Sequence, residues 1–154
     1  MARRKEKSYS GPDRRKPANI LIVNDDADST KLLRRLLEHK GYTVVKADAR
    51  EEALLIATQE LPRAIVIDLT HGGIGSNLKL LESLRHHEDE RVATSRVVLI
   101  ARQASNRVFS FQSGADAFIT RPFHGDELTD QLGKILALPF RDLPQHRRQQ
   151  LEGY

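Results

Sequence analysis

The chain has 154 residues, a formal net charge of +4 and no cysteine, which predicts one domain and excludes disulfides and thiolate chemistry. No apolar run reaches the ~20 residues of a membrane-spanning helix, and the charged start lacks the apolar stretch of a secretory signal. We therefore expect a cytoplasmic chain that does not insert into a membrane.

The positive charge lies mainly in an N-terminal arm. Residues 1–16 carry seven basic and two acidic side chains, residues 139–154 have a net charge of +1, and the segment between them has −2. Because residues 1–17 contain almost nothing apolar, they cannot offset their ordering entropy, which predicts a flexible basic arm. We favour a solvated tail over non-specific contact of residues 1–16 with nucleic acid phosphates. Contact with an acidic protein is also open.

The first half of the chain alternates short apolar runs with helical patterns. Residues 20–23 form a predicted strand that ends in acids, and Asp28 is the expected cap of a helix with a leucine stripe that closes at Gly41. Residues 42–45 are β-branched and predict a second strand. Asp48 is the expected cap of the second helix.

The same alternation continues in the second half. Residues 64–67 predict a strand that ends in Asp68, and a glycine-containing loop precedes a helix with leucines over 80–84. A strand at 97–100, a helix at 106–113 and a strand at 117–120 follow. The last predicted helix has apolar residues at i, i+4, i+7 and i+8 between 128 and 136. Residues 139–154 should begin with a short packed turn at Phe140 and Leu143 and then fray, which makes them a partly disordered C-terminal extension.

The strands are continuous apolar runs, which is typical of a parallel sheet buried on both faces. The pattern therefore predicts an α/β fold, a doubly wound five-stranded parallel sheet with helices on both faces. Right-handed crossovers place the loops after every strand at one edge, where ligands bind in such sheets.

Polar side chains follow three of the strands at this edge. They are Asn24, Asp25 and Asp26 after the first strand, Asp68 after the third and Arg121 after the fifth. Taken singly, each is explained as a helix cap or a turn residue. Together, two groups of carboxylates would repel unless a cation lay between them, and a few oxygens with open positions suit Mg²⁺. A strand-end aspartate beside such a metal can attack a phosphoryl group and form an aspartyl phosphate.

Over about residues 18–138 the sequence resembles the receiver domain of bacterial two-component response regulators. The matching stretches are ILIVNDD (20–26), LLRRLLEHKGY (32–42), IVIDL (65–69) and GADAFITRPF (114–123). The resemblance implies a flavodoxin-like fold with strand order 2-1-3-4-5 and a signalling role without enzyme activity.

The family's roles are assigned where positions match. By this resemblance Asp68 is the phospho-acceptor, and Asp25, Asp68 and the Thr70 backbone carbonyl hold Mg²⁺. Asn24 stands where the family has an acid, so it is at most a weak ligand. Phe118 matches an aromatic residue that turns inward on activation.

Other positions depart from the family pattern. Arg121 replaces a lysine, which keeps the charge but exchanges a compact ammonium group for a planar fork. Ala101 replaces a threonine or serine, so the hydroxyl that binds the phosphoryl group is absent. Arg102 follows it and is expected to be solvated. Pro122 matches a proline that is cis in the family.

We therefore expect an atypical response regulator that stands alone, since residues 139–154 are too few for an output domain. It would accept a phosphoryl group on Asp68 with Mg²⁺ from a sensor histidine kinase or phosphotransfer protein and signal by contact with a downstream protein. The alternative is a phosphorylation-independent, receiver-like interaction module with a degraded acidic pocket. Whether the chain forms a homodimer is open.

Overall fold

The computed structural model describes residues 19–70 and 73–152. Its five strands are β1 (Asn19–Val23), β2 (Thr43–Ala47), β3 (Ala64–Ile67), β4 (Arg96–Ala101) and β5 (Ala117–Thr120). All neighbouring strands are parallel, and their order is β2-β1-β3-β4-β5. The predicted sheet and its strand order are confirmed. The predicted basic arm lies outside the described residues.

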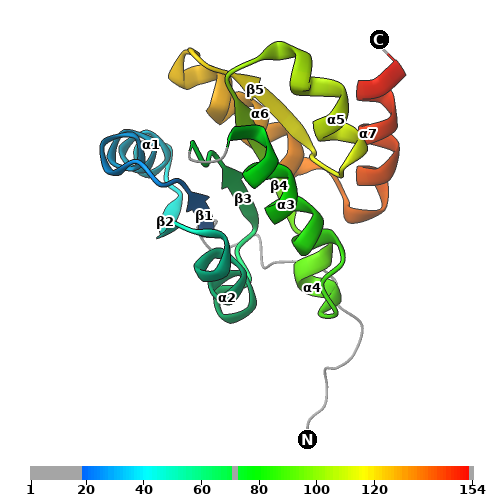
Figure 1. Ribbon diagram of the computed structural model, residues 1–154, viewed down its shortest axis with the longest axis horizontal. Helices are drawn as coiled ribbons and strands as arrows, with labels where there is room; N and C mark the ends of the chain where they lie inside the picture. Colours follow the sequence, from blue (N-terminus) through cyan, green and yellow to red (C-terminus); the bar gives the residue numbers. More distant parts are fainter. Residues whose placement is uncertain (1–18, 71–72, 153–154) are drawn as a thin grey trace, which may run out of the picture.

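Seven α-helices and two short 3₁₀ turns connect and follow these strands in the described part of the chain. They are α1 (Ala27–His39), α2 (Arg50–Glu60), α3 (Gly73–Arg85), α4 (Glu90–Ala93), η2 (Ala104–Asn106), α5 (Arg107–Gln112), α6 (Gly125–Ala137), η3 (Phe140–Asp142) and α7 (Leu143–Glu152). Figure 1 shows α7 beside α5 at one side of the molecule. None of these helices is long and apolar enough to cross a membrane.

The sheet separates two hydrophobic cores. Side chains of α2, α3 and α5 pack on one face, and side chains of α1 and α6 pack on the other. Successive residues of β1 alternate between them, since Leu21 lies in the first core and Ile20 and Ile22 lie in the second. This two-sided burial is the reason for the continuous apolar runs, and the predicted helices on both faces are confirmed.

Both predicted helix caps are wrong. The side chain of Asp26 caps α1 by accepting from the Ser29 N–H, while Asp28 already lies in the first helical turn. Helix α2 has Ala49 at its N-cap position without a side-chain hydrogen bond. A cap must directly precede the helix, and Asp48 lies one residue too early. Its own backbone N–H donates to Glu52 at the start of α2 instead.

The middle of the chain is more helical than predicted. Helix α3 begins at Gly73, inside the segment expected to be a loop, and the single turn of α4 has no counterpart among the predicted elements. Asp89 caps α4 by accepting from the Arg91 N–H. Four residues are too few to show a helical period, so the sequence carries no pattern for this turn.

The fraying expected after Leu143 is wrong for Leu143–Glu152, which form α7. Arg96 of β4, 2% exposed, ties the end of α6 to this extension. Its Nε and Nη2 donate to the carbonyl oxygens of Ile135 and Leu138 at 2.7 and 2.6 Å, and its guanidinium lies 4.2 Å from the centre of the Phe140 ring. Because Arg96 comes from β4, the local composition of the extension did not reveal this contact.

Candidate functional site

The carboxyl ends of β1, β3 and β5 bring the polar residues of the sequence analysis together. Asp68 follows β3 and is 3% exposed, and Asn24 follows the neighbouring strand β1. Arg121 follows β5 and reaches across the end of β4 to Asp68. The peptide bond between Arg121 and Pro122 is cis, as expected. Asp25 and Thr70 complete the group.

The Arg121 guanidinium lies directly on the Asp68 carboxylate. Its Nη2 donates to Oδ2 of Asp68, and its Nε donates to Oδ1 at 3.4 Å, so the two planar groups face each other as a fork. The same Nη2 donates to the Ser29 hydroxyl at 2.8 Å. One cation is therefore already bound to both oxygens of the predicted phospho-acceptor.

Asn24 presents its amide nitrogen, not its oxygen, to Asp68. The side-chain Nδ2 donates to Asp68 Oδ2 at 3.2 Å and to the Ser29 hydroxyl at 2.9 Å. The side-chain Oδ1 accepts from the Asp26 backbone N–H at 2.7 Å. Because Asn24 is 2% exposed, this orientation is fixed by its surroundings.

Asp25 connects the loops after β1 and β3. Its Oδ1 accepts from both the backbone N–H and the hydroxyl of Thr70, at 2.9 and 2.6 Å. The Thr70 carbonyl oxygen, the expected metal contact, lies 3.4 Å from the Gly73 backbone nitrogen, which donates to it. Both predicted ligands thus have hydrogen-bond partners within the protein.

The electrostatics of Asp68 reflect its burial. Loss of solvent raises the pKa of Asp68 above its ordinary value, and the nearby Asp25 charge raises this pKa further. The hydrogen bond and the charge of Arg121 act in the opposite direction, as does the charge of Arg102. The two guanidinium groups therefore favour the ionised carboxylate at this edge of the sheet.

This arrangement does not fit Mg²⁺, the ion that the family resemblance implies. The Asn24 oxygen is used by the loop, Asp25 Oδ1 accepts two hydrogen bonds, and Asp68 is bound by a guanidinium. Among residues 19–70 and 73–152, no three His, Cys, Asp or Glu side chains are grouped as metal ligands. A divalent cation at Asp68 would compete with Arg121 for the carboxylate oxygens, because two neighbouring cations repel each other.

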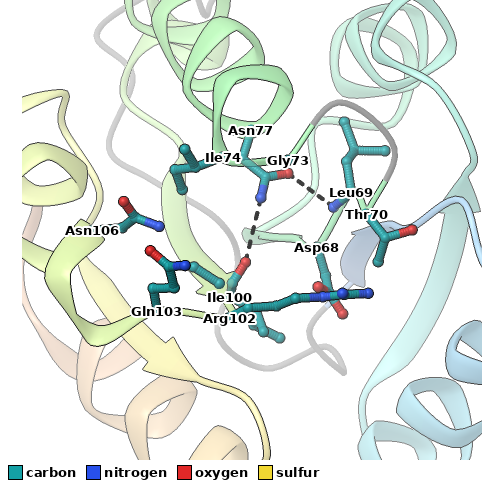
Figure 2. A pocket seen from close by; sticks show the side chains of 11 residues that line it. Asp68, Leu69, Thr70, Gly73, Ile74, Asn77, Ile100, Arg102, Gln103 and Asn106 are labelled. Carbon is teal, nitrogen blue, oxygen red and sulfur yellow. Dashed lines mark hydrogen bonds between the residues drawn. The ribbon is translucent and has the colours of Figure 1, made fainter.

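A cavity of about 280 Å³ opens beside Asp68 (Figure 2). Asn77 of α3 connects two segments that line this cavity. Its Oδ1 accepts from the Leu69 N–H at 2.9 Å, and its Nδ2 donates to the Ile100 carbonyl oxygen at 3.4 Å. Arg102 is exposed, as predicted, and Figure 2 shows its side chain extending toward Asp68.

Ala101 lines the cavity, and Phe118 lies in the hydrophobic core to which Ala101 also belongs. Ala101 lines the cavity with its methyl group and is 7% exposed. Phe118 is 8% exposed and belongs to the same hydrophobic core as Ala101. The aromatic ring therefore occupies the inward position in this structure.

Sequence reasoning missed two residues of this site. Ser29 accepts hydrogen bonds from both Asn24 and Arg121, and no motif pointed to it. Asn77 is 2% exposed and lies on the face of α3 that also carries Leu80 and Leu84. A polar residue in phase with a leucine stripe was the signal that could have found it.

Comparison with known proteins gives a consistent assignment. The family model of the response regulator receiver domain matches residues 20–133. Response regulator MprA of Mycolicibacterium vanbaalenii is 33% identical over 121 residues, which are 78% of this chain and 51% of that protein. Transcriptional regulatory protein ResD of Bacillus subtilis is 29% identical over 125 residues, 80% of this chain and 50% of that protein. The chain thus spans about half the length of these curated relatives.

Solved structures show the same likeness. A chain described as a response regulator from Chloroflexus aurantiacus superposes with a TM-score of 0.72 and 31% identity, over 80% of this chain and 100% of that one. The signal receiver domain of a signal transduction histidine kinase from Syntrophus aciditrophicus gives a TM-score of 0.67 and 28% identity, over 78% of this chain and 90% of that one.

Proposed function

The chain belongs to the response regulator receiver domain family of two-component signalling, and on this premise we propose that it signals by protein contact without phosphorylation. In this proposal Arg121 replaces the metal ion as the cation on Asp68. The module acts in the cytoplasm as a binding partner and not as an enzyme.

The observation that carries the proposal is the pairing of Arg121 with Asp68. A guanidinium that donates to both oxygens of Asp68 stabilises the negative charge of the carboxylate and so makes it a weaker nucleophile. Asn24 gives the carboxylate a third donor, by donating to Oδ2. Phosphorylation would have to break this pairing in a nearly buried site, where a charged hydrogen bond contributes more than in water.

The core behind the site supports a single conformation. In the family pattern a hydroxyl at position 101 follows the phosphoryl group and the aromatic residue turns inward. Here Ala101 has no hydroxyl, and Phe118 is already buried in the hydrophobic core to which Ala101 belongs. We infer that the surface above these residues is presented constantly to a partner protein, with the sensor kinases and phosphotransfer proteins of the family as the class of upstream contact.

The cavity beside Asp68 favours a second candidate, phosphoryl acceptance on Asp68 by a route adapted to arginine. The cavity is open to Asp68, and Arg102 lies at its wall. A phosphoryl group there would face Arg102 and Arg121, two cations that stabilise its negative charge.

Intact-mass measurement after incubation with a small phosphodonor and Mg²⁺ separates the two candidates. We expect no gain of a phosphoryl mass in the wild-type chain. The control is the triple variant Asn24→Asp, Ala101→Thr, Arg121→Lys, which restores the family residues and should gain one phosphoryl group. A wild-type gain that disappears in Asp68→Asn would overturn phosphorylation independence and support the second candidate.

A further inference from the structure

One wall of the cavity beside Asp68 is formed just before α5. Gln103 and Asn106 line the cavity, and Figure 2 shows both at the side away from Asp68. Ser110 of α5 is fully buried, and its hydroxyl donates to the Asn106 carbonyl oxygen at 2.8 Å. A movement of α5 would therefore move this wall of the cavity as well.

The helical turns η2 and α5 have little local support of their own. Helix α5 has six residues, of which Ser110 and Phe111 are buried, while Phe109 is 64% exposed. Among the described residues, no side-chain hydrogen bond caps the start of η2 or of α5. Because a helix this short is marginal without tertiary contacts, its position depends on the elements that pack against it.

Helix α7 supplies such contacts. Gln150 Oε1 accepts from Arg107 Nη2 at 3.0 Å, and the Arg107 guanidinium lies 4.7 Å from the centre of the Phe111 ring. Leu151 packs against the hydrophobic core that contains Phe111. Figure 1 shows α7 lying along α5. A polar and an apolar side chain of α7 therefore both contribute to holding α5 in place.

The other side of α7 is attached to a buried carboxylate. Asp116 precedes β5, and its side chain is fully buried. Its Oδ1 accepts from Arg147 Nε at 2.6 Å, and its carbonyl oxygen accepts from His146 Nε2 at 2.8 Å. Leu143 at the start of α7 is 2% exposed. These contacts fix α7 to the domain independently of its contacts with α5.

Asp116 is in turn held by α3 and β4. Its Oδ2 accepts from Arg85 Nη2 at 3.0 Å and from the Val97 N–H at 2.8 Å. Arg85 also donates, at 2.6–3.0 Å, to the carbonyl oxygens of Ala93, Ser95 and Gly114. Burial lowers the pKa of Arg85 to about 10, which leaves it charged at neutral pH. The carboxylate thus has a cation on each oxygen, and α7 is anchored to elements other than α5.

We propose that α7 restrains η2 and α5 against the rest of the domain and thereby keeps the cavity wall beside Asp68 in one conformation. The helix connects the Asp116 anchor, through His146 and Arg147, to α5, through Gln150 and Leu151. The inference rests on the proposed function, in which a partner protein meets a constant surface, and it names the element that keeps this surface constant.

Backbone order parameters from nitrogen-15 relaxation of the full-length chain test this restraint. The double variant Gln150→Ala, Leu151→Ala removes the contacts to α5 and leaves those to Asp116. The control Gln145→Ala, Gln149→Ala removes two exposed side chains from the same helix.

We expect the order parameters of residues 104–112 to fall from about 0.85 to below about 0.7 in the double variant, and to stay near 0.85 in the control. The order parameters of β3 should stay near 0.85 in both proteins. This result would separate a restraint on α5 from a general loss of order.

Equal order parameters of residues 104–112 in the double variant and the control would overturn the proposal, as would a loss of order that extends equally to β3. If circular dichroism shows that the double variant does not fold, Gln150→Ala compared with Gln149→Ala gives the same decision. The samples contain no phosphodonor, so phosphorylation of the wild type in the mass measurement would contradict the proposed function without changing this result.

Discussion

At the scale of single residues, the chemistry of the site depends on Arg121, which replaces the lysine of the family pattern, and on its neighbours. Arginine at position 121 offers two donors in a plane, and both reach Asp68. Ser29 fixes the direction of the fork, although it lies 92 positions earlier in the chain. The sequence pattern could therefore indicate that Asp25, Asp68, Thr70 and Arg121 share one edge of the sheet. It could not indicate where the guanidinium points, because that depends on a contact between distant segments.

Restoring the family residues around Asp68 should create a Mg²⁺ site. In the double variant Asn24→Asp, Arg121→Lys a new carboxylate replaces an amide, and the fork is removed from Asp68. We expect Mg²⁺ affinity, measured by isothermal titration calorimetry, to rise roughly tenfold or more over the wild type. Adding Asp25→Ala to the double variant should abolish the gain. An equal affinity of wild type and double variant would show that Arg121 does not compete with a metal.

The raised pKa of Asp68 predicts a specific pH dependence of stability. An acid whose pKa is higher in the folded state binds more protons when folded, so its contribution to stability falls as the pH rises. Each unit of the shift costs about 1.4 kcal/mol at neutral pH. Relative to Asp68→Asn, the wild type should lose unfolding free energy between pH 3.8, the ordinary pKa, and the raised value, and then level off. Urea unfolding of both proteins across this pH range measures the difference. A wild-type unfolding free energy that rises with pH relative to Asp68→Asn would contradict a raised pKa of Asp68.

At the scale of elements, strand positions were easier to predict than helix ends. Strands β3 and β5 have the predicted bounds because each is an apolar run with a polar residue directly after it. The caps of α1 and α2 were misassigned because several acids lie near each start, and a shift of one or two residues decides which one can reach a free N–H. Helix α7 was missed because its stability comes from Asp116 and Arg107, outside its own sequence.

Substitution of the α1 cap tests the corrected assignment. Asp26→Ala removes the oxygen that accepts from the Ser29 N–H and should lower the free energy of unfolding by about 1 kcal/mol. Asp28→Ala is the matched control, since Asp28 is an exposed acid in the first turn, where its interaction with the helix dipole should contribute about 0.3 kcal/mol. Thermal and urea unfolding of both variants measure the difference. A larger loss in Asp28→Ala would restore the cap predicted from the sequence.

At the scale of the whole molecule, the positive net charge does not describe the folded domain. The acids that matter for the site lie at the carboxyl edge of the sheet, whereas the excess of bases lies in residues 1–16, outside the described residues. Binding by such an arm would act through phosphates and would fall steeply with salt. The net charge of the chain therefore does not locate a functional surface on the domain.

Nucleic acid binding by the full-length chain tests this division of charge. We expect fluorescence anisotropy with mixed-sequence duplex DNA to show no binding at physiological salt. Weak binding at low salt should disappear when the seven bases of residues 1–16 are replaced by glutamine. Binding that withstands physiological salt, or that survives in the neutralised variant, would place a nucleic acid surface on the domain itself.

The most direct test of the central claim is a crystal structure of the wild-type chain grown in excess Mg²⁺. We expect the Arg121 guanidinium within hydrogen-bond distance of both Asp68 oxygens, the Asn24 amide nitrogen on Oδ2, and no metal ion at the site. A Mg²⁺ ion bound between Asp25 and Asp68, with Arg121 turned away from the carboxylate, would contradict it.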